Sequence, residues 1–252
     1  MNHYRFSANT GFLWKELPFI DRIRRAAACG FDAVEFHDEA QQADTLALSD
    51  VLTEAGLRVL GLNVRMGETA GCAAIASREK EALKDIDIAI ETAQRIGAGS
   101  IHVLAGRTGD EGNRSSYLRA LRHALNASDI TILIEPICRA AMPDYFLHDI
   151  DQAAEILDEI DNPRLRILFD CYHIEAEHGA MMEQFHKHKS RIGHIQIASF
   201  PERAEPNQGS IDYGIALREF LAAGYGGFFG CEYNPKKAVE VGLSWRDQFQ
   251  LS

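Results

Sequence analysis

The sequence lacks the features that mark secreted and membrane-spanning proteins. Its five cysteines are odd in number and show no Cys-x-x-Cys spacing, which argues against a disulfide framework and favours a reducing compartment. No apolar run approaches the ~20 residues that cross a bilayer, and the N-terminus has no apolar stretch of the signal-peptide kind. We therefore expect a cytoplasmic protein without a membrane partner.

Basic charge is also scarce. Lys and Arg number 26 against 37 Asp and Glu, giving a formal net charge of −11, and no basic cluster interrupts this balance. Because an acidic protein repels a phosphate backbone, we expect no nucleic-acid partner. No Pro- or Ser-rich linker divides the chain, so a single domain over residues 1–252 is expected.

Short apolar runs alternate with amphipathic stretches along the whole chain. The first half contains predicted strands at 4–8, 33–36, 58–62 and 100–104, with helices at about 16–29, 43–55, 77–96 and 115–126. The second half contains strands near 131–135, 166–170, 193–198 and 228–232, with helices near 148–160, 179–189, 213–223 and 238–249. Eight βα repeats of this total length predict an α/β fold, a single-domain (β/α)8 TIM barrel, over a doubly wound open sheet.

Each of the last four predicted strands ends in a side chain with a ligating oxygen: Glu135, Asp170, Gln196 and Glu232. The carboxyl ends of barrel strands meet at one rim, so these groups are expected to lie close together. Buried carboxylates cost several kcal/mol unless they are paired or bind a cation. An all-oxygen set suits Mg²⁺ or Mn²⁺ better than Zn²⁺. One divalent metal is predicted here; a helix cap or an ion pair explains any one such residue equally well, but explains four together less well.

Two of these carboxylates also suit proton transfer. Glu135 and Glu232 come from different sides of the barrel mouth, and each could use one oxygen for the metal and the other as an acid or base. A metal chelated by a 2-hydroxycarbonyl stabilises the enediolate that forms when a carbon-bound proton leaves. His173 is a candidate substrate contact, with a packed loop histidine as the alternative. Glu35 at the second strand's end is expected either at the mouth or on the surface.

Several segments together resemble one family. They are Ile134-Glu135-Pro136-Ile137, Phe169-Asp170-Cys171-Tyr172-His173, Gly193-His194-Ile195-Gln196-Ile197-Ala198, Pro201-Glu202-Arg203-Ala204-Glu205-Pro206, Gly230-Cys231-Glu232-Tyr233 and Glu240-Val241-Gly242-Leu243-Ser244-Trp245. In this order they resemble the hydroxypyruvate isomerases, which are xylose-isomerase-like barrels. The resemblance implies the same four metal ligands, with Glu135 and Glu232 as proton donor and acceptor. It also implies interconversion of hydroxypyruvate and tartronate semialdehyde, or isomerisation of a 2-oxo-tetronate.

The substrates implied by this resemblance carry a carboxylate, which calls for a cation. Arg203 matches a family arginine and is the first candidate. The loop after the third strand, which begins at Asn63, is shorter than in the family; Asn63 and Arg65 are further substrate-binding candidates, with Arg65 as a second cation. Ser210 and Glu175 also depart from the family pattern, so the reaction class is better supported than the substrate.

Three other functions stay open. A ketose 3-epimerase or another sugar isomerase would use the same barrel. An AP endonuclease-like metal phosphodiesterase would need more metal ligands and a basic face. A catalytically inert sugar-binding protein would not need two carboxylates beside one metal. The sequence decides neither between proton transfer and a hydride shift nor whether the chain forms a homo-oligomer.

Overall fold

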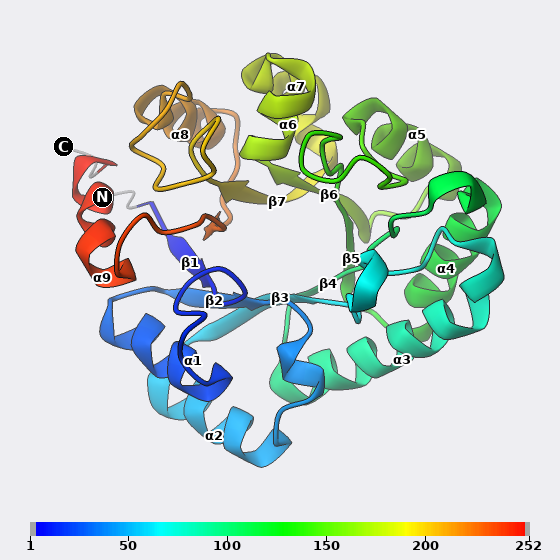
Figure 1. Cartoon of the computed structure of the whole chain (residues 1–252), viewed down its shortest axis with the longest axis horizontal. Helices are drawn as coiled ribbons and strands as arrows, with labels where there is room; N and C mark the ends of the chain where they lie inside the picture. The colour runs from blue at the N-terminus through cyan, green and yellow to red at the C-terminus, as the bar shows by residue number, and fades with distance from the viewer. Residues whose placement is uncertain (1–3, 250–252) are drawn as a thin grey trace.

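A computed structural model describes residues 4–249, and eight parallel strands form a closed barrel at its centre (Figure 1). The strands are β1 (Phe6–Asn9), β2 (Ala33–Phe36), β3 (Arg58–Asn63), β4 (Ser100–His102), β5 (Thr131–Ile134), β6 (Leu165–Asp170), β7 (Ile192–Ile197) and β8 (Phe229–Cys231). Each strand pairs with the next in sequence, and β8 pairs with β1 to close the ring. The prediction of a (β/α)8 TIM barrel is confirmed.

Helices surround the barrel (Figure 1). They are α1 (Phe19–Ala28), α2 (Thr45–Ala55), α3 (Glu79–Ile96), α4 (Arg114–Ala127), α5 (Ile150–Ile160), α6 (Cys171–His178), α7 (Met181–His188), α8 (Tyr213–Ala222) and α9 (Val239–Gly242). Short 3₁₀ segments lie at Glu39–Gln41, Gly67–Thr69, Ala76–Arg78, Gly109–Glu111 and Lys189–Arg191, and a longer one at Leu243–Phe249. Within residues 4–249, no helix combines the length and apolarity needed to cross a bilayer.

Local sequence signals explain most helix boundaries. Helix α2 begins where the Asp44 side chain accepts a hydrogen bond from the Ala47 amide at 2.8 Å, as expected of an N-cap. Helices α2 and α3 end at Gly56 and Gly97, whose φ angles of 64° and 68° place them in the left-handed region that glycine adopts without strain. Helix α1 begins after Pro18, later than residue 16, because proline suits the start of a helix.

The predicted elements differ from the structure in two places. Helix α6, which follows Asp170 directly, was not expected; the Asp170 side chain caps it by accepting from the Tyr172 amide at 2.8 Å. The expected helix at 238–249 is instead the four-residue α9 followed by a 3₁₀ segment. The extent of the single domain over residues 1–252 stays a prediction at its two ends, which lie outside the described residues.

The two faces of the barrel strands differ in chemistry. Apolar side chains such as Ile101, Ile132 and Ile195 are fully buried in the main apolar core. Polar side chains from β2 and β7, Glu35 and His194, line a small cavity within the barrel. This alternation is the period-2 pattern of strands. The interior of the barrel therefore holds polar side chains beside apolar ones.

Candidate metal and active site

The four predicted metal ligands are buried at the carboxyl ends of adjacent strands. Asp170 is the last residue of β6, Gln196 lies near the end of β7, and Glu135 and Glu232 follow β5 and β8 directly. Their exposed fractions are only 5% for Glu135, 1% for Asp170, 3% for Gln196 and 8% for Glu232. Because carboxylates are rarely buried to this degree without a partner, the cluster requires a compensating positive charge.

Arg203 supplies positive charge to two of these carboxylates. Its Nη2 atom lies 2.9 Å from Asp170 Oδ2 and 2.7 Å from Glu232 Oε1. The guanidinium also stacks over Phe12 and Tyr172, with 4.7 and 5.0 Å from Cζ to the ring centroids. Two aromatic faces and two carboxylates fix this planar group in the loop after β7.

The remaining oxygens of the cluster fit a hard metal ion. Oε1 of Glu135 and Oε1 of Gln196 are both buried, and neither has a hydrogen-bond partner among the residues that the structure describes. An unpaired buried oxygen costs about 1–3 kcal/mol, more when it is charged. A bound cation would supply the partner that both oxygens lack. Ligand atoms of Glu135, Asp170 and His173 lie within 4.8 Å of one another. The residues present therefore fit one divalent cation, with carboxylate and amide oxygens as its main ligands and the His173 nitrogen beside them.

Burial and neighbouring charges raise the pKa values of the three carboxyl groups in the cluster. Burial, with the nearby charges of Glu232 and Asp170, raises the pKa of Glu135 well above its usual range. Burial raises the pKa of Asp170 to about 7, although Arg203 acts in the opposite direction. The pKa of Glu232 is also raised, mainly by burial. A bound divalent cation would favour the ionised forms of all three groups.

A cavity of about 170 Å³ opens beside these groups. Its polar lining includes Asn63, His173 and Arg203, so three of the predicted substrate-binding residues are brought together with the ligand cluster. Within the described part of the chain, Arg203 is the one Lys or Arg side chain among the lining residues. The other lining residues are mainly apolar and include Met66, Ala70, Leu104, Ile137 and Met142. The cavity suits a small ligand with one negative group.

His173 contacts the cluster as a neutral side chain. Its Nε2 atom lies 3.6 Å from Asp170 Oδ2 and 3.9 Å from Glu135 Oε1, while Nδ1 lies 3.2 Å from Cys138 Sγ. Burial, with Arg203 and His102 nearby, lowers the pKa of His173 well below its usual range. His173 can therefore interact with a substrate or with the carboxylates as an uncharged hydrogen-bonding group.

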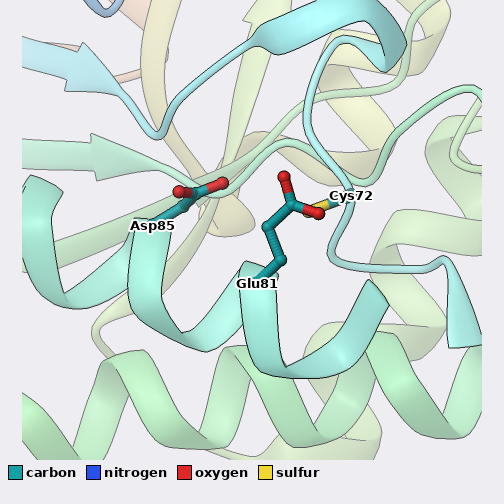
Figure 2. Close-up of side chains that lie close together, drawn as sticks. All are labelled: Cys72, Glu81 and Asp85. Atoms are coloured by element: carbon teal, nitrogen blue, oxygen red, sulfur yellow. The ribbon is translucent and has the colours of Figure 1, made fainter. Parts of the chain in front are cut away.

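Arg65, the second predicted cation for the substrate, pairs with acidic side chains and is not among the residues that line the cavity. Its Nε atom lies 3.1 Å from both carboxylate oxygens of Asp85, and its guanidinium also contacts Glu81. Figure 2 shows Glu81 and Asp85 on successive turns of α3, beside Cys72. Arg65 lies in the loop after β3, as the sequence indicated. Its guanidinium forms ion pairs with two carboxylates of α3 and does not line the cavity.

The cluster of Cys72, Glu81 and Asp85 has ligand atoms within 4.8 Å of one another (Figure 2). Two arginines already neutralise its carboxylates, because Arg78 donates to both oxygens of Glu81 at 2.8 Å and Arg65 contacts Glu81 and Asp85. Burial raises the pKa of the Cys72 thiol to about 11, which keeps it protonated. This cluster therefore joins the loop after β3 to α3.

Three polar residues of the site were not among the predicted site residues: Asn9, His102 and His194. Asn9 Nδ2 donates to Glu232 Oε2 at 2.6 Å, and His102 Nδ1 lies 3.6 Å from Glu135 Oε2. Asn9 and His102 could have been found from the sequence by their position, because Asn9 is the last residue of β1 and His102 is the last residue of β4. His194 Nε2 lies 2.9 Å from Oε1 of Glu35. The sequence left open whether Glu35 lies at the barrel mouth or on the surface, and the structure buries it inside the barrel.

Glu35 and His194 form a buried ion pair. Burial alone would raise the pKa of Glu35, but His194, Ser7 and Gln196 together hold it below its usual value. Burial likewise lowers the pKa of His194, and the charge and hydrogen bond of Glu35 outweigh this and raise it. Each group therefore favours the charged form of the other within the buried pair.

Comparison with known proteins agrees with this arrangement. The family model described as Xylose isomerase-like TIM barrel matches residues 23–249. The chain is 37% identical to the 2-oxo-tetronate isomerase of Cupriavidus necator, over 96% of each chain. It is 34% identical to the hydroxypyruvate isomerase of Escherichia coli, over 98% of this chain and 99% of that one. The chain belongs to the hydroxypyruvate isomerase family. The prediction that it is an isomerase is confirmed.

A solved structure agrees over the whole fold. The Brucella melitensis protein named as an AP endonuclease, family 2, superposes with a TM-score of 0.92 at 30% identity, covering 98% of this chain and all of that one. The 3-keto-D-glucoside 4-epimerase of E. coli superposes with a TM-score of 0.79 at 21% identity, over 97% of this chain and 99% of that one, and shares the fold alone.

Proposed function

We propose that this chain is a divalent-metal-dependent aldose–ketose isomerase that acts on a small 2-oxo or 2-hydroxy acid. Hydroxypyruvate and a 2-oxo-tetronate are the substrates that the names of the curated relatives suggest. The observation that supports this most strongly is the pair of buried oxygens of Glu135 and Gln196, which have no hydrogen-bond partner within residues 4–249 and lie beside the carboxylates of Asp170 and Glu232. These four residues would hold the cation.

Arg203 is suited to bind the substrate carboxylate. It is the lining guanidinium nearest the cluster, and its aromatic neighbours hold its plane in place. A guanidinium binds a carboxylate through two parallel hydrogen bonds, which fixes both position and orientation. A substrate held in this way has its reacting carbons beside Glu135 and Glu232, and the cavity of about 170 Å³ favours a short chain.

Glu135 and Glu232 then move the proton. They follow β5 and β8, and their carboxylates are buried next to the same cavity. Burial and the neighbouring carboxylates raise the pKa of Glu135, which favours its protonated form and suits it to donate a proton. A cation bound beside them would stabilise the negative charge that develops on the substrate oxygens. One carboxylate removes a proton from a substrate carbon, and the other returns a proton to the neighbouring carbon. The hydroxyl proton passes from the oxygen of the first carbon, which becomes the new carbonyl, to the oxygen of the second, which becomes the new hydroxyl.

The test is turnover by metal-depleted protein to which Mn²⁺ or Mg²⁺ is added back. We expect isomerisation of hydroxypyruvate or a 2-oxo-tetronate only with metal, and incorporation of solvent deuterium into the product. Turnover of neutral ketoses alone would reassign the chain to the sugar epimerases. Turnover without deuterium incorporation would replace proton transfer by a hydride shift.

Cleavage of abasic DNA is the second function to test, because the Brucella protein is named as an AP endonuclease. We propose that this chain does not share it, since its net charge of −11 opposes binding to a phosphate backbone. A gel assay with a duplex that contains one abasic site should show no metal-dependent cleavage. Cleavage at that site would contradict this part of the proposal.

A further inference from the structure

Beneath the rim, a continuous series of hydrogen bonds leads from the barrel interior to the predicted metal ligands. His194 Nε2 lies 2.9 Å from Glu35 Oε1, and Gln196 Nε2 donates to Glu35 Oε2 at 2.9 Å. The same Nε2 donates to Glu232 Oε2 at 2.6 Å. All four side chains are buried, with exposed fractions of 9% or less. Glu35 therefore connects a buried histidine to a predicted ligand without contacting the cavity beside the metal cluster.

This series of bonds determines which atom of the Gln196 carboxamide is left available to a cation. The two hydrogens on Nε2 are used by two carboxylates, Glu35 and Glu232. Oε1 is left buried and, in the part of the chain that the structure describes, without a hydrogen-bond partner. Rotating the amide by half a turn would place Oε1 against two carboxylate oxygens and lose both hydrogen bonds. A metal binds the oxygen of a carboxamide and is repelled by its NH₂ group, so the orientation decides whether Gln196 can be a ligand.

Glu35 reaches Gln196 only because β8 has no side chain where the carboxylate crosses. Glu35 is on β2, and β1 and β8 lie between β2 and β7 in the ring. Gly230 of β8 is paired in register with Gln196. A Cβ atom on Gly230 would come 2.4 Å from Glu35 Oε1 and 2.8 Å from Gln196 Cγ. His194 and the Ser7 hydroxyl hold the carboxylate from its other side. The position of Glu35 is therefore fixed by three strands other than its own.

We propose that Glu35 is a positioning residue that fixes the carboxamide of Gln196 with its oxygen toward the divalent cation. This inference rests on the proposed function, because it requires the metal site. Glu35 acts through Gln196 and touches neither cation nor substrate. It follows that the affinity for metal depends on a carboxylate of β2, although the four predicted ligands come from β5 to β8.

The experiment measures the Mn²⁺ dissociation constant of metal-depleted protein by isothermal titration calorimetry. Glu35→Gln keeps the shape of the side chain and removes its charge, so one of the two carboxylates that require the NH₂ group of Gln196 is lost. We expect Glu35→Gln to weaken Mn²⁺ binding by ~10–100-fold, the usual effect of losing a group that orients a metal ligand. Glu54→Gln, the same substitution on the exposed part of α2, is the matched control and should leave the constant unchanged.

A second background separates positioning from a purely electrostatic effect of the lost charge. In protein with Gln196→Ala there is no amide to orient, so adding Glu35→Gln should change the Mn²⁺ dissociation constant by less than ~2-fold, well below the effect expected when Gln196 is present. An equal loss in both backgrounds would show that Glu35 does not act through Gln196 and would overturn the inference. A merely structural role would lower the thermal midpoint of Glu35→Gln without changing its Mn²⁺ dissociation constant, which would also overturn it.

Mn²⁺ binding by the unsubstituted protein separates a failure of the metal site from a failure of the role of Glu35. If the unsubstituted protein binds no Mn²⁺, both the metal-dependent function and this inference are wrong. If it binds Mn²⁺ and Glu35→Gln binds equally well, only the role of Glu35 is wrong. Should Glu35→Gln not fold, Glu35→Asp keeps the charge beside His194 but withdraws it from Gln196. The same weakening of Mn²⁺ binding is expected for it, and unchanged binding would overturn the inference.

Discussion

Arg203 donates from Nη2 to Oδ2 of the fully buried Asp170 over 2.9 Å. The same carboxylate is a predicted metal ligand, so a guanidinium of the protein and a metal ion are attracted to one oxygen. Arg203 is also the group best placed for the substrate carboxylate. Binding of metal and substrate would therefore transfer Arg203 from Asp170 to the substrate, while the cation takes its place beside Asp170.

Replacing Arg203 should affect substrate and metal in opposite directions. Arg203→Gln removes a charged hydrogen bond to the substrate carboxylate, worth about 1.5–3 kcal/mol, so KM for hydroxypyruvate should rise by ~10–100-fold. Mn²⁺ binding in the absence of substrate should become tighter, because the guanidinium no longer competes for Asp170. Steady-state kinetics at saturating Mn²⁺ and calorimetry measure the two effects. An unchanged KM would remove Arg203 from the substrate site.

Arg65, an arginine that does not line the cavity, is the matched control for Arg203. Its contacts with Asp85 and Glu81 are partly exposed, so Arg65→Gln should lower the free energy of unfolding by no more than about 1 kcal/mol. KM should stay within about twofold of the unsubstituted value, since no substrate contact worth 1.5–3 kcal/mol is lost. Thermal unfolding and the same kinetic assay measure these. A rise in KM like that expected for Arg203→Gln would return Arg65 to the substrate site.

The sequence predicted the fold and the position of the cluster because both follow from strand patterning. Buried strands are recognised by their composition, and the carboxyl ends of eight parallel strands in one barrel necessarily meet at one rim. Glu135, Asp170, Gln196 and Glu232 could therefore be placed together without knowing any contact. Resemblance to a family added Arg203, which lies in a loop where periodicity gives no information.

Other residues depended on contacts that sequence spacing does not encode. Arg65 is in the loop that borders the cavity. Whether its guanidinium points to the cavity or to Asp85 depends on which face of α3 packs against the loop, and sequence spacing does not show that. The sequence identified Glu35 as a carboxylate at the end of a strand but did not identify its partners. Its partners Gln196 and His194 are over 150 positions away along the chain and come together only when β8 closes the barrel. Long-range pairing of this kind requires the tertiary structure.

The close approach of Glu35 to Gly230 predicts a stability effect. Gly230→Ala places a methyl group 2.4 Å from Glu35 Oε1 and must displace the carboxylate, so it should lower the free energy of unfolding by about 1–3 kcal/mol. Gly226→Ala is the control, because a Cβ there meets nothing within 4 Å. Urea unfolding of both variants measures the difference. Equal stabilities would mean that Glu35 does not cross the barrel next to β8.

The raised pKa of Asp170 predicts an unusual pH dependence of the metal-free protein. Its pKa is about 7 when folded and about 3.9 in an unfolded chain, so the folded state keeps a proton that the unfolded state releases. The resulting stability is fully present below about pH 4 and is lost as the pH rises through 7. Metal-depleted protein should lose thermal stability between pH 5 and 8 relative to Asp170→Asn, which cannot titrate.

Added Mn²⁺ should reverse this trend. The cation binds the ionised carboxylate, so its stabilising effect should grow over the same pH range, as the proton is lost more easily. Differential scanning calorimetry with and without Mn²⁺ at pH 5.5 and 8 measures this. A metal effect that is larger at the lower pH would contradict the assignment of Asp170 as a ligand.

The turnover of Mn²⁺-loaded Glu135→Gln tests the central claim most directly. This substitution keeps an oxygen that can ligate the metal and removes the ability to accept and donate a proton. With bound Mn²⁺ verified by calorimetry, the account predicts a fall in kcat for hydroxypyruvate of at least about 100-fold, the range of a lost general acid or base. Turnover at the unsubstituted rate by the metal-loaded variant would contradict proton transfer through Glu135.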